Sequence, residues 1–411
     1  MRRLWHSIGL VPLFAASPAL AQLIPSVPNL PTSLAPGQLL GRVDEALENG
    51  AGRVAQRLEA IRRDAAARLV RAYPDRIVLD PDGNLARAGE VVVDDPDAAL
   101  LAAMHAKGYA VLAREDVLGV RYTRLAVPRG RTLGQAIREL RKLGAGNVTA
   151  DQLHATSGNV PASPAPAAAG SGTVVGVIDG AVPGATLRAG FASGAPRDSD
   201  HATAVASLIS GAGIVRGGLP GARIASADVY GTDPAGGNAT AIARAIGWMV
   251  DNRVSVVTIS LTGPANPVLG KVIAAAQARG TAIVAAVGNN GPAAPPAYPA
   301  SYPGVVAVTG VDARGRVLIE AGRAGHLDYA APGADMLAMA AGGRTMRVRG
   351  TSFAAPLVAA TLARFYPAAS AGQLQAAIAK VDAVARDAGA RGPDPVFGRG
   401  IVCEACRTPA R

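Results

Sequence analysis

The sequence TVVGVIDG, residues 173–180, decides the fold class. Its apolar residues run without alternation, which is typical of a strand buried on both faces of a parallel sheet. Four further runs of this kind follow, and Ala-rich helical stretches separate them. The runs cover residues 224–229, 254–259, 282–287 and 305–311, and helices are expected at about 201–210, 239–252, 268–279, 352–365 and 371–381. This alternation predicts a doubly wound parallel α/β sheet with helices on both faces.

The region upstream of this sheet divides by composition. Residues 155–172 are almost entirely Ala, Pro, Ser and Gly, and they predict a flexible linker. Residues 75–154 show the order strand, helix, strand, strand, helix, which suggests a small α+β ferredoxin-like module. Residues 22–74 form a Pro-rich lead-in followed by an amphipathic pattern from about Leu39 to Tyr73. That pattern predicts a long helix, which could pack on the next domain or pair with a partner helix.

The first 21 residues read as a signal peptide. Arg2 and Arg3 precede a short apolar stretch, residues 8–16, and a small-residue cleavage site ends at Ala21. We therefore expect an exported protein, secreted or periplasmic, whose mature chain begins near Gln22. No apolar run reaches the ~20 residues that a membrane-spanning helix requires, so no membrane span is expected. Export would permit a local disulfide between the two cysteines of the C-terminal tail, residues 401–411, which carry a C-x-x-C at Cys403 and Cys406.

Composition and charge exclude several classes of protein. Of the 411 residues, 49% are hydrophobic, which argues against a chain that is disordered along its whole length. The net charge is +11, but its arginines are scattered instead of clustered. Nucleic-acid binding surfaces usually show a basic stripe, so we expect no nucleic-acid partner.

Functional sites of such sheets lie outside the carboxyl ends of the strands, and four polar residues occur at these positions. Asp179 follows the first strand, Asn289 follows a later strand, and His201 and Ser352 each open a helix. A serine hydroxyl becomes an effective nucleophile when a nearby histidine takes its proton. A buried aspartate can hold that histidine in the required tautomer. Taken singly, each residue could equally be a turn or helix-capping residue.

Seven segments in order resemble the successive motifs of the subtilase family of serine peptidases. They span roughly residues 172–370 and read VVGVIDG, HATAVASLISG, VVTISLTGP, AAVGNNG, AYPASYPGVVAVTGV, APG and GTSFAAP. The chain order Asp, His, Ser is also the triad order of subtilisin. The resemblance implies a triad of Asp179, His201 and Ser352, with Asn289 donating to the oxyanion. It also implies a subtilisin-like catalytic domain over residues 173–400.

The resemblance extends to substrates and regulation. It implies protein or peptide substrates, which would pair with the edge segment Ser260, Leu261, Thr262 and Gly263 and face a pocket wall that includes Ala286 and Gly288. The N-terminal module would match the inhibitory propeptides of the family, which makes the protein's own N-terminal region an intramolecular partner. The precursor would cut itself between about Leu153 and Thr173. The chemistry needs no cofactor or catalytic metal, and structural calcium is compatible with the family although no stretch of sequence defines a site.

Two alternatives remain open at this point. One is a catalytically silent subtilase-like binding or regulatory protein, and the other is an esterase that uses the same acyl-enzyme chemistry. The sequence also departs from the family pattern near the histidine. Ala202 and Ala204 stand where Gly and His are usual, and Gly180 follows Asp179 without an intervening small hydroxyl residue. These departures remove no catalytic group.

Overall fold

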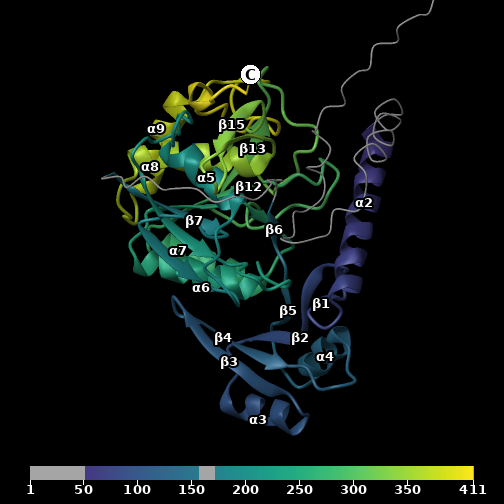
Figure 1. Cartoon of the computed structure of the whole chain (residues 1–411). Coiled ribbons are helices and arrows are strands. Elements are labelled where there is room, and N and C mark those ends of the chain that lie inside the picture. Colours follow the sequence, from purple (N-terminus) through teal and green to yellow (C-terminus); the bar gives the residue numbers. More distant parts are fainter. Residues whose placement is uncertain (1–50, 157–171, 411) are drawn as a thin grey trace, which may run out of the picture.

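The structure is a computed structural model that describes residues 51–156 and 172–410. It has a small N-terminal module and a larger domain, which lie one above the other in Figure 1. The expected signal peptide, the lead-in before Ala51 and most of the expected linker lie outside the described residues.

The larger domain is built on a seven-stranded parallel sheet, as the sequence predicts. The strand order is β14-β13-β12-β10-β7-β9-β8. The strands are β7 (Val174–Asp179), β8 (Leu187–Gly190), β9 (Arg223–Asp228), β10 (Val256–Ile259), β12 (Ala282–Ala286), β13 (Val306–Val311) and β14 (Tyr329–Pro332). The sequence did not predict β8 and β14, because these short strands at the two edges of the sheet contain no long apolar run.

Helices cover both faces of this sheet, which confirms the doubly wound class. They are α5 (Asp200–Ser210), α6 (Ala239–Asp251), α7 (Pro267–Ala278), α8 (Ala355–Phe365) and α9 (Leu374–Val384). Helices α5, α8 and α9 share one buried cluster with the sheet, while α6 and α7 share another. Both faces of the strands are therefore buried, which explains their continuous apolar sequence.

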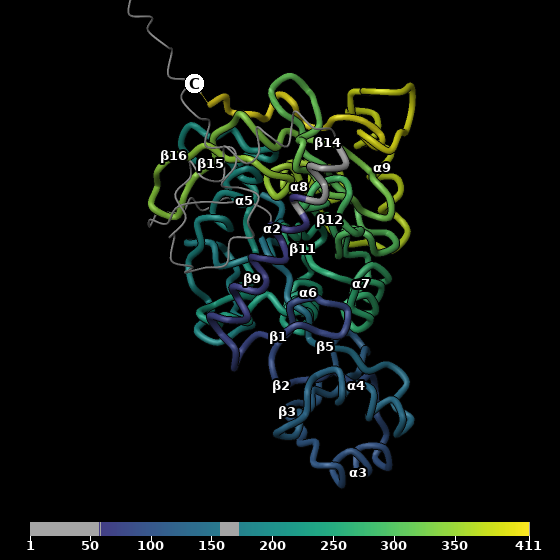
Figure 2. Tube along the Cα trace, turned by 90° about the vertical axis from the view of Figure 1, so that its right-hand side faces the viewer, coloured from purple at the N-terminus to yellow at the C-terminus, as the bar shows by residue number. Residues whose placement is uncertain are grey.

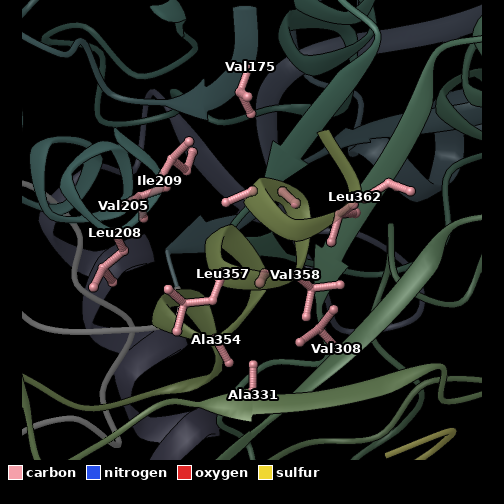
Figure 3. Close-up of a cluster of buried hydrophobic side chains, with 14 of the residues drawn as sticks. Val175, Val205, Leu208, Ile209, Val308, Ala331, Ala354, Leu357, Val358 and Leu362 are labelled. Carbon is pink, nitrogen blue, oxygen red and sulfur yellow. The ribbon is translucent and has the colours of Figure 1, made fainter. Parts of the chain in front are cut away.

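Helix α8 lies at the centre of the larger core (Figure 3). Leu357 projects from it toward α5 and Val358 projects toward Val308 of β13, and both residues, like Leu362, are essentially fully buried. Replacing one buried leucine by alanine typically costs about 2–5 kcal/mol in such cores. The turn that precedes α8 is therefore held on a firmly packed helix.

The N-terminal module is a ferredoxin-like antiparallel sheet, as expected, with two helices. Strand β2 is central: β5 pairs along one of its edges, β1 and β4 pair with successive parts of the other edge, and β3 lies outside β4. The elements are β1 (Ile77–Leu79), β2 (Leu85–Asp94), α3 (Ala98–Ala106), β3 (Ala110–Val117), β4 (Val120–Ala126), α4 (Leu133–Lys142) and β5 (Val148–Gln152). In Figure 2 the module lies below the larger domain, with α3 at its far end.

The long helix expected before this module is α2 (Ala51–Ala72). Its C-terminal part packs through Leu69 against Ile77 of β1 and Ala235 of the larger domain. The helix thus contacts both bodies. This is the packing on the next domain that the amphipathic pattern allowed.

Two segments differ from their expected structure. Residues 155 and 156, expected to begin the linker, form strand β6 (Ala155–Thr156), which pairs with β11 (Leu261–Thr262). Ser352, expected to open the helix, lies in the 3-10 turn η2 (Thr351–Phe353) just before α8. A short segment such as 155–156 carries no periodicity, so its pairing depends on a partner strand more than 100 residues away.

The C-terminal tail is part of the larger domain. Ile401 and Val402 are buried, and Leu337 donates its backbone N–H to the carbonyl of Thr408 at 2.8 Å. Leu337 belongs to the hairpin of β15 (Met336–Met339) and β16 (Thr345–Val348). Cys403 and Cys406 form a disulfide across the 3-10 turn η3 (Glu404–Cys406). The tail therefore packs on the larger domain, beyond the expected end of that domain at residue 400.

Within the described part of the chain, no helix is both long enough and apolar enough to cross a membrane.

Candidate active site

Asp179 and His201 form a buried acid–histidine pair at the end of β7. His201 Nδ1 lies 2.7 Å from Asp179 Oδ2, and the two residues are 6% and 0% exposed. His201 is held in the first turn of α5, which Ser199 caps by accepting the backbone N–H of Ala202. The other carboxylate oxygen of Asp179 accepts the N–H of Gly180 at 2.7 Å. These bonds orient the imidazole so that its second nitrogen, Nε2, faces away from the aspartate.

Ser352 lies in the turn η2, and two hydrogen bonds tie it to Ser260. Ser352 Oγ donates to the Ser260 carbonyl at 3.1 Å, and Ser260 Oγ donates to the Ser352 carbonyl at 2.8 Å. The ring of the next residue, Phe353, lies 5.4 Å from the His201 ring, centre to centre. His201 Nε2 has no hydrogen-bond partner among the described residues. The turn that carries Ser352 therefore lies next to His201, while the Ser352 hydroxyl is bonded to the carbonyl of Ser260 and not to the imidazole. Hydrogen bonds between a serine nucleophile and its base often form fully only when substrate binds.

Asn289 is connected directly to the serine turn. Its Oδ1 accepts the backbone N–H of Thr351 at 3.0 Å, and the residue is 6% exposed. Because a backbone N–H can only donate, this bond fixes which end of the amide is oxygen. The donor of this side chain is consequently Nδ2, and its position is set relative to Ser352.

The predicted substrate-pairing edge carries a strand of the protein's own N-terminal region. Thr156 lies opposite Leu261 and Ala155 lies opposite Thr262 in an antiparallel pair. On the other side, the backbone N–H of His154 donates to the Gly237 carbonyl at 2.9 Å. Residues 153–156 thus lie as a strand between β11 and the segment that leads into α6.

The His154 side chain is enclosed at this point. It is 1% exposed, and a Cβ atom on Gly263 would lie 2.6 Å from its ring. Neither ring nitrogen has a hydrogen-bond partner within the described ranges. Burial lowers the pKa of His154 to about 4, and the backbone of Gln152 acts weakly in the opposite direction. The neutral ring is therefore the form that fits this site.

Polar contacts fix the end of β5 to the helices of the larger domain. Asp151, which is fully buried, accepts the backbone N–H and the hydroxyl of Thr240 at 3.0 and 2.7 Å, at the start of α6. Gln152 Oε1 accepts from Asn266, the capping residue of α7, at 2.7 Å. The helix dipole stabilises the Asp151 carboxylate at the start of α6, and the Gln152 amide adds a neutral hydrogen bond at the start of α7. Both contacts favour docking of the module.

Ion pairs and apolar contacts extend this interface. Arg87 of β2 lies 2.8 Å from Asp233, and Arg244 of α6 lies 3.2 Å from Glu115 of β3. Val117 packs so closely on α6 that a Cβ atom on Gly247 would lie 2.8 Å from it. These contacts could not be predicted from the sequence, because the partners are far apart along the chain and no spacing rule connects them.

The structure also explains the departures near the histidine. A Cβ atom on Gly180 would lie 2.4 Å from Cβ of Ser199, so no larger residue fits after Asp179. Ala202 and Ala204 are fully buried in the cluster shared with α8. Both positions therefore serve packing, and neither contributes a group to the site.

The two predicted pocket-wall residues lie at and beyond the end of β12. Ala286 is fully buried, and Gly288 lies so close to Thr262 that an added Cβ would be 3.1 Å from its side chain. The wall and the pairing edge are therefore neighbours. Among the described residues, no group of three or more His, Cys, Asp or Glu side chains could hold a metal ion.

Comparison with known proteins agrees with this geometry. The model of the subtilase family matches residues 170–400, which is more than half of the chain. Subtilisin amylosacchariticus from Bacillus subtilis subsp. amylosacchariticus is 33% identical over 122 residues. That match covers 29% of this chain and 32% of the relative, so the chain spans about a third of the relative's length.

Two solved structures are similar in fold. Fervidolysin from Fervidobacterium pennivorans, a keratinolytic enzyme related to subtilisin, has a TM-score of 0.65 at 20% identity, over 81% of this chain and 63% of that one. The epidermin leader peptide processing serine protease of Staphylococcus aureus has a TM-score of 0.61 at 16% identity, over 77% and 97%. The fold of these structures and the parallel sheet agree with the match of the family model. That match, over more than half of the chain, shows that the chain belongs to the subtilase family.

Proposed function

We propose that this protein is an exported serine endopeptidase, secreted or periplasmic, that is made as a precursor and hydrolyses peptide bonds through an acyl-enzyme intermediate. One observation carries the proposal. A short strand of the chain itself, Ala155 and Thr156, pairs with β11, and the residue that precedes β11, Ser260, is hydrogen-bonded in both directions to Ser352. A groove that binds an extended backbone beside a nucleophile suits a peptidase better than an esterase.

In the proposed reaction, His201 acts as the base for Ser352. Rotation of the Ser352 hydroxyl away from the Ser260 carbonyl would direct it to Nε2 of His201, which takes the proton as Oγ attacks the substrate carbonyl. Asp179 then stabilises the imidazolium through the 2.7 Å contact at Nδ1. His201 returns the proton to the leaving amine, and water hydrolyses the acyl-enzyme by the reverse sequence.

The negative charge on the attacked carbonyl oxygen needs donors that are already in place. Asn289 supplies its Nδ2 group, which the bond from Thr351 to Oδ1 holds in orientation. The backbone N–H of Ser352, close to the start of α8, is the second donor in this proposal. Both donors belong to segments fixed by the central core.

The N-terminal module is proposed as an intramolecular inhibitor. Its last described strand, β6, lies in the groove where a substrate would pair, and Asp151 and Gln152 hold that strand in place through the starts of α6 and α7. After a cut beyond Thr156, the strand would remain in the groove as a bound product. Inhibition would then last until the module dissociates.

A fluorophosphonate probe tests the proposed activity, because it reacts covalently only with an activated serine. We expect the secreted protein to be labelled once its module has been released, and the Ser352→Ala variant to remain unlabelled. Ser193, an exposed serine of the larger domain, supplies the control, since Ser193→Ala should label like wild type. A released domain that does not react would instead identify a catalytically silent binding protein.

We expect acid to accelerate release of the module, because the buried side chain of His154 must stay neutral while the module is docked. Burial lowers the pKa of the docked histidine from 6.5 to about 4, so the docked form favours the neutral ring. The docking free energy is therefore intact above the free pKa and falls as the pH drops from about 6.5 toward 4. Between about pH 7.5 and pH 5, the affinity of the cut module should fall about 30-fold from this group alone.

The rate of fluorophosphonate labelling at the two pH values measures this release. Protonation of His201 slows labelling at low pH in every variant. The informative quantity is therefore the labelling rate of wild type divided by that of a His154→Leu protein, in which an apolar side chain that cannot be protonated fills the site. His105, an exposed histidine of α3, is the matched control, because His105→Leu should retain the acid response of wild type. Equal pH dependence in wild type and His154→Leu would refute this role of His154.

A further inference from the structure

A charged pair lies beside the two loops that carry Asn289 and Ser352. Arg349 Nε is 2.7 Å from Glu320 Oε1, and Arg349 Nη2 donates to Glu320 Oε2 at 2.8 Å. The Glu320 side chain is only 4% exposed, and that of Arg349 is 22% exposed. A two-point contact between a guanidinium and a carboxylate fixes direction as well as distance.

The backbone around Glu320 pairs with the residues on both sides of Asn289. Gly291 donates its N–H to the carbonyl of Glu320 at 2.9 Å, and Gly322 donates its N–H to the carbonyl of Gly288 at 2.7 Å. The segment 320–322 therefore holds residues 288–291 at two points. Asn289 lies between those two points.

The Glu320–Arg349 pair provides a second connection between the Asn289 loop and the Ser352 turn. Arg349 is three residues before Ser352, and Thr351 donates its N–H to Asn289 Oδ1 at 3.0 Å. One connection between the two loops thus runs directly from Asn289 to Thr351. The other runs from the backbone beside Asn289 through Glu320 to the side chain of Arg349.

We propose that the Glu320–Arg349 pair positions the oxyanion donor, by holding the Asn289 loop and the Ser352 turn at a fixed separation. This inference rests on the proposed peptidase activity. Glu320 and Arg349 are positioning residues here, because they act through Asn289. A donor must meet the developing oxyanion at about 2.7–3.1 Å, and a misplacement of about 1 Å can cost ~10²-fold in rate.

The test compares kcat and KM of the mature enzyme on a peptide p-nitroanilide with an apolar P1 residue. Glu320→Gln keeps the shape of the side chain and removes its charge. We expect kcat to fall about 10- to 100-fold with KM within about two-fold of wild type, because the lost interaction is made in the transition state. Arg349→Lys keeps the charge but loses the fork, and should give a smaller loss of the same kind.

A double-mutant cycle separates positioning from simple stabilisation. If the pair acts through Asn289, Glu320→Gln should cost little further kcat in an Asn289→Leu background. The matched control is Glu404→Gln, which breaks a two-point pair with Arg386 on the C-terminal segment and should leave kcat unchanged. Should Glu320→Gln fail to fold, Arg349→Lys alone and in the Asn289→Leu background decides the question.

Two results would overturn the inference. One is an unchanged kcat in both Glu320→Gln and Arg349→Lys, and the other is a full additive loss on top of Asn289→Leu. Failure of the proposed activity looks different, because the wild-type enzyme would then show neither p-nitroanilide hydrolysis nor Ser352-dependent fluorophosphonate labelling.

Discussion

The Ser352→Ala precursor is expected to keep its N-terminal module covalently attached, whereas the wild-type protein should be cut shortly after Thr156. The pairing of Thr156 with Leu261 sets the direction of the chain, so continuing past Thr156 leads toward Ser260 and Ser352. Residues 153–156 are already paired in the groove, so the cut should fall on their C-terminal side. N-terminal sequencing of the secreted products measures this. The mutant sequence should start near Gln22.

Two observations would argue against self-cleavage. The first is a Ser352→Ala protein that is processed at the same bond and at the same rate, which would assign the cut to another protease, since exposed linkers are cut by many enzymes. The second is processing of Ser352→Ala only after active wild-type enzyme is added, which would show that the cut occurs between molecules. The Ser193→Ala control should be processed like wild type.

Replacing Asn289 by leucine is expected to lower kcat by about 10²–10³ with little change in KM, the size of loss known for an oxyanion donor of subtilisin. The side chain of Asn289 is oriented by Thr351, so its Nδ2 group does not need to reorganise when the oxyanion forms. Steady-state hydrolysis of the p-nitroanilide gives both constants. A loss confined to kcat would mark an interaction made in the transition state.

Asn289→Leu also removes the acceptor of the Thr351 N–H, so a control for general damage is needed. Asn290→Leu makes the same change one residue further along, where the side chain borders a cavity between this loop and α2. We expect near-normal kcat and a similar melting temperature for Asn290→Leu. If Asn289→Leu retains full kcat, Asn289 has no part in the reaction.

Much of the site was predictable because its residues follow buried strands or open helices in short, ordered motifs. The sequence alone predicts that one edge of the sheet carries Asp179, His201, Asn289 and Ser352, since the carboxyl ends of parallel strands meet at that edge. The finer geometry was not predictable. Neither the bond from Thr351 to Asn289 nor the orientation of the Ser352 hydroxyl toward Ser260 has a counterpart in residue spacing.

The amino-acid order alone specifies the longer helices and the central buried strands of this protein, because hydrophobic periodicity and turn residues act over a few neighbours. The tertiary structure decides which of those elements meet. Ala155 and Thr156 read as the start of a linker, yet they form a strand because β11 offers unpaired backbone groups beside them. His154, Asp151 and Glu320 likewise gain their surroundings from segments distant in sequence. Burial and partner geometry are properties of the packed chain, and they decide how each of these side chains is enclosed and oriented.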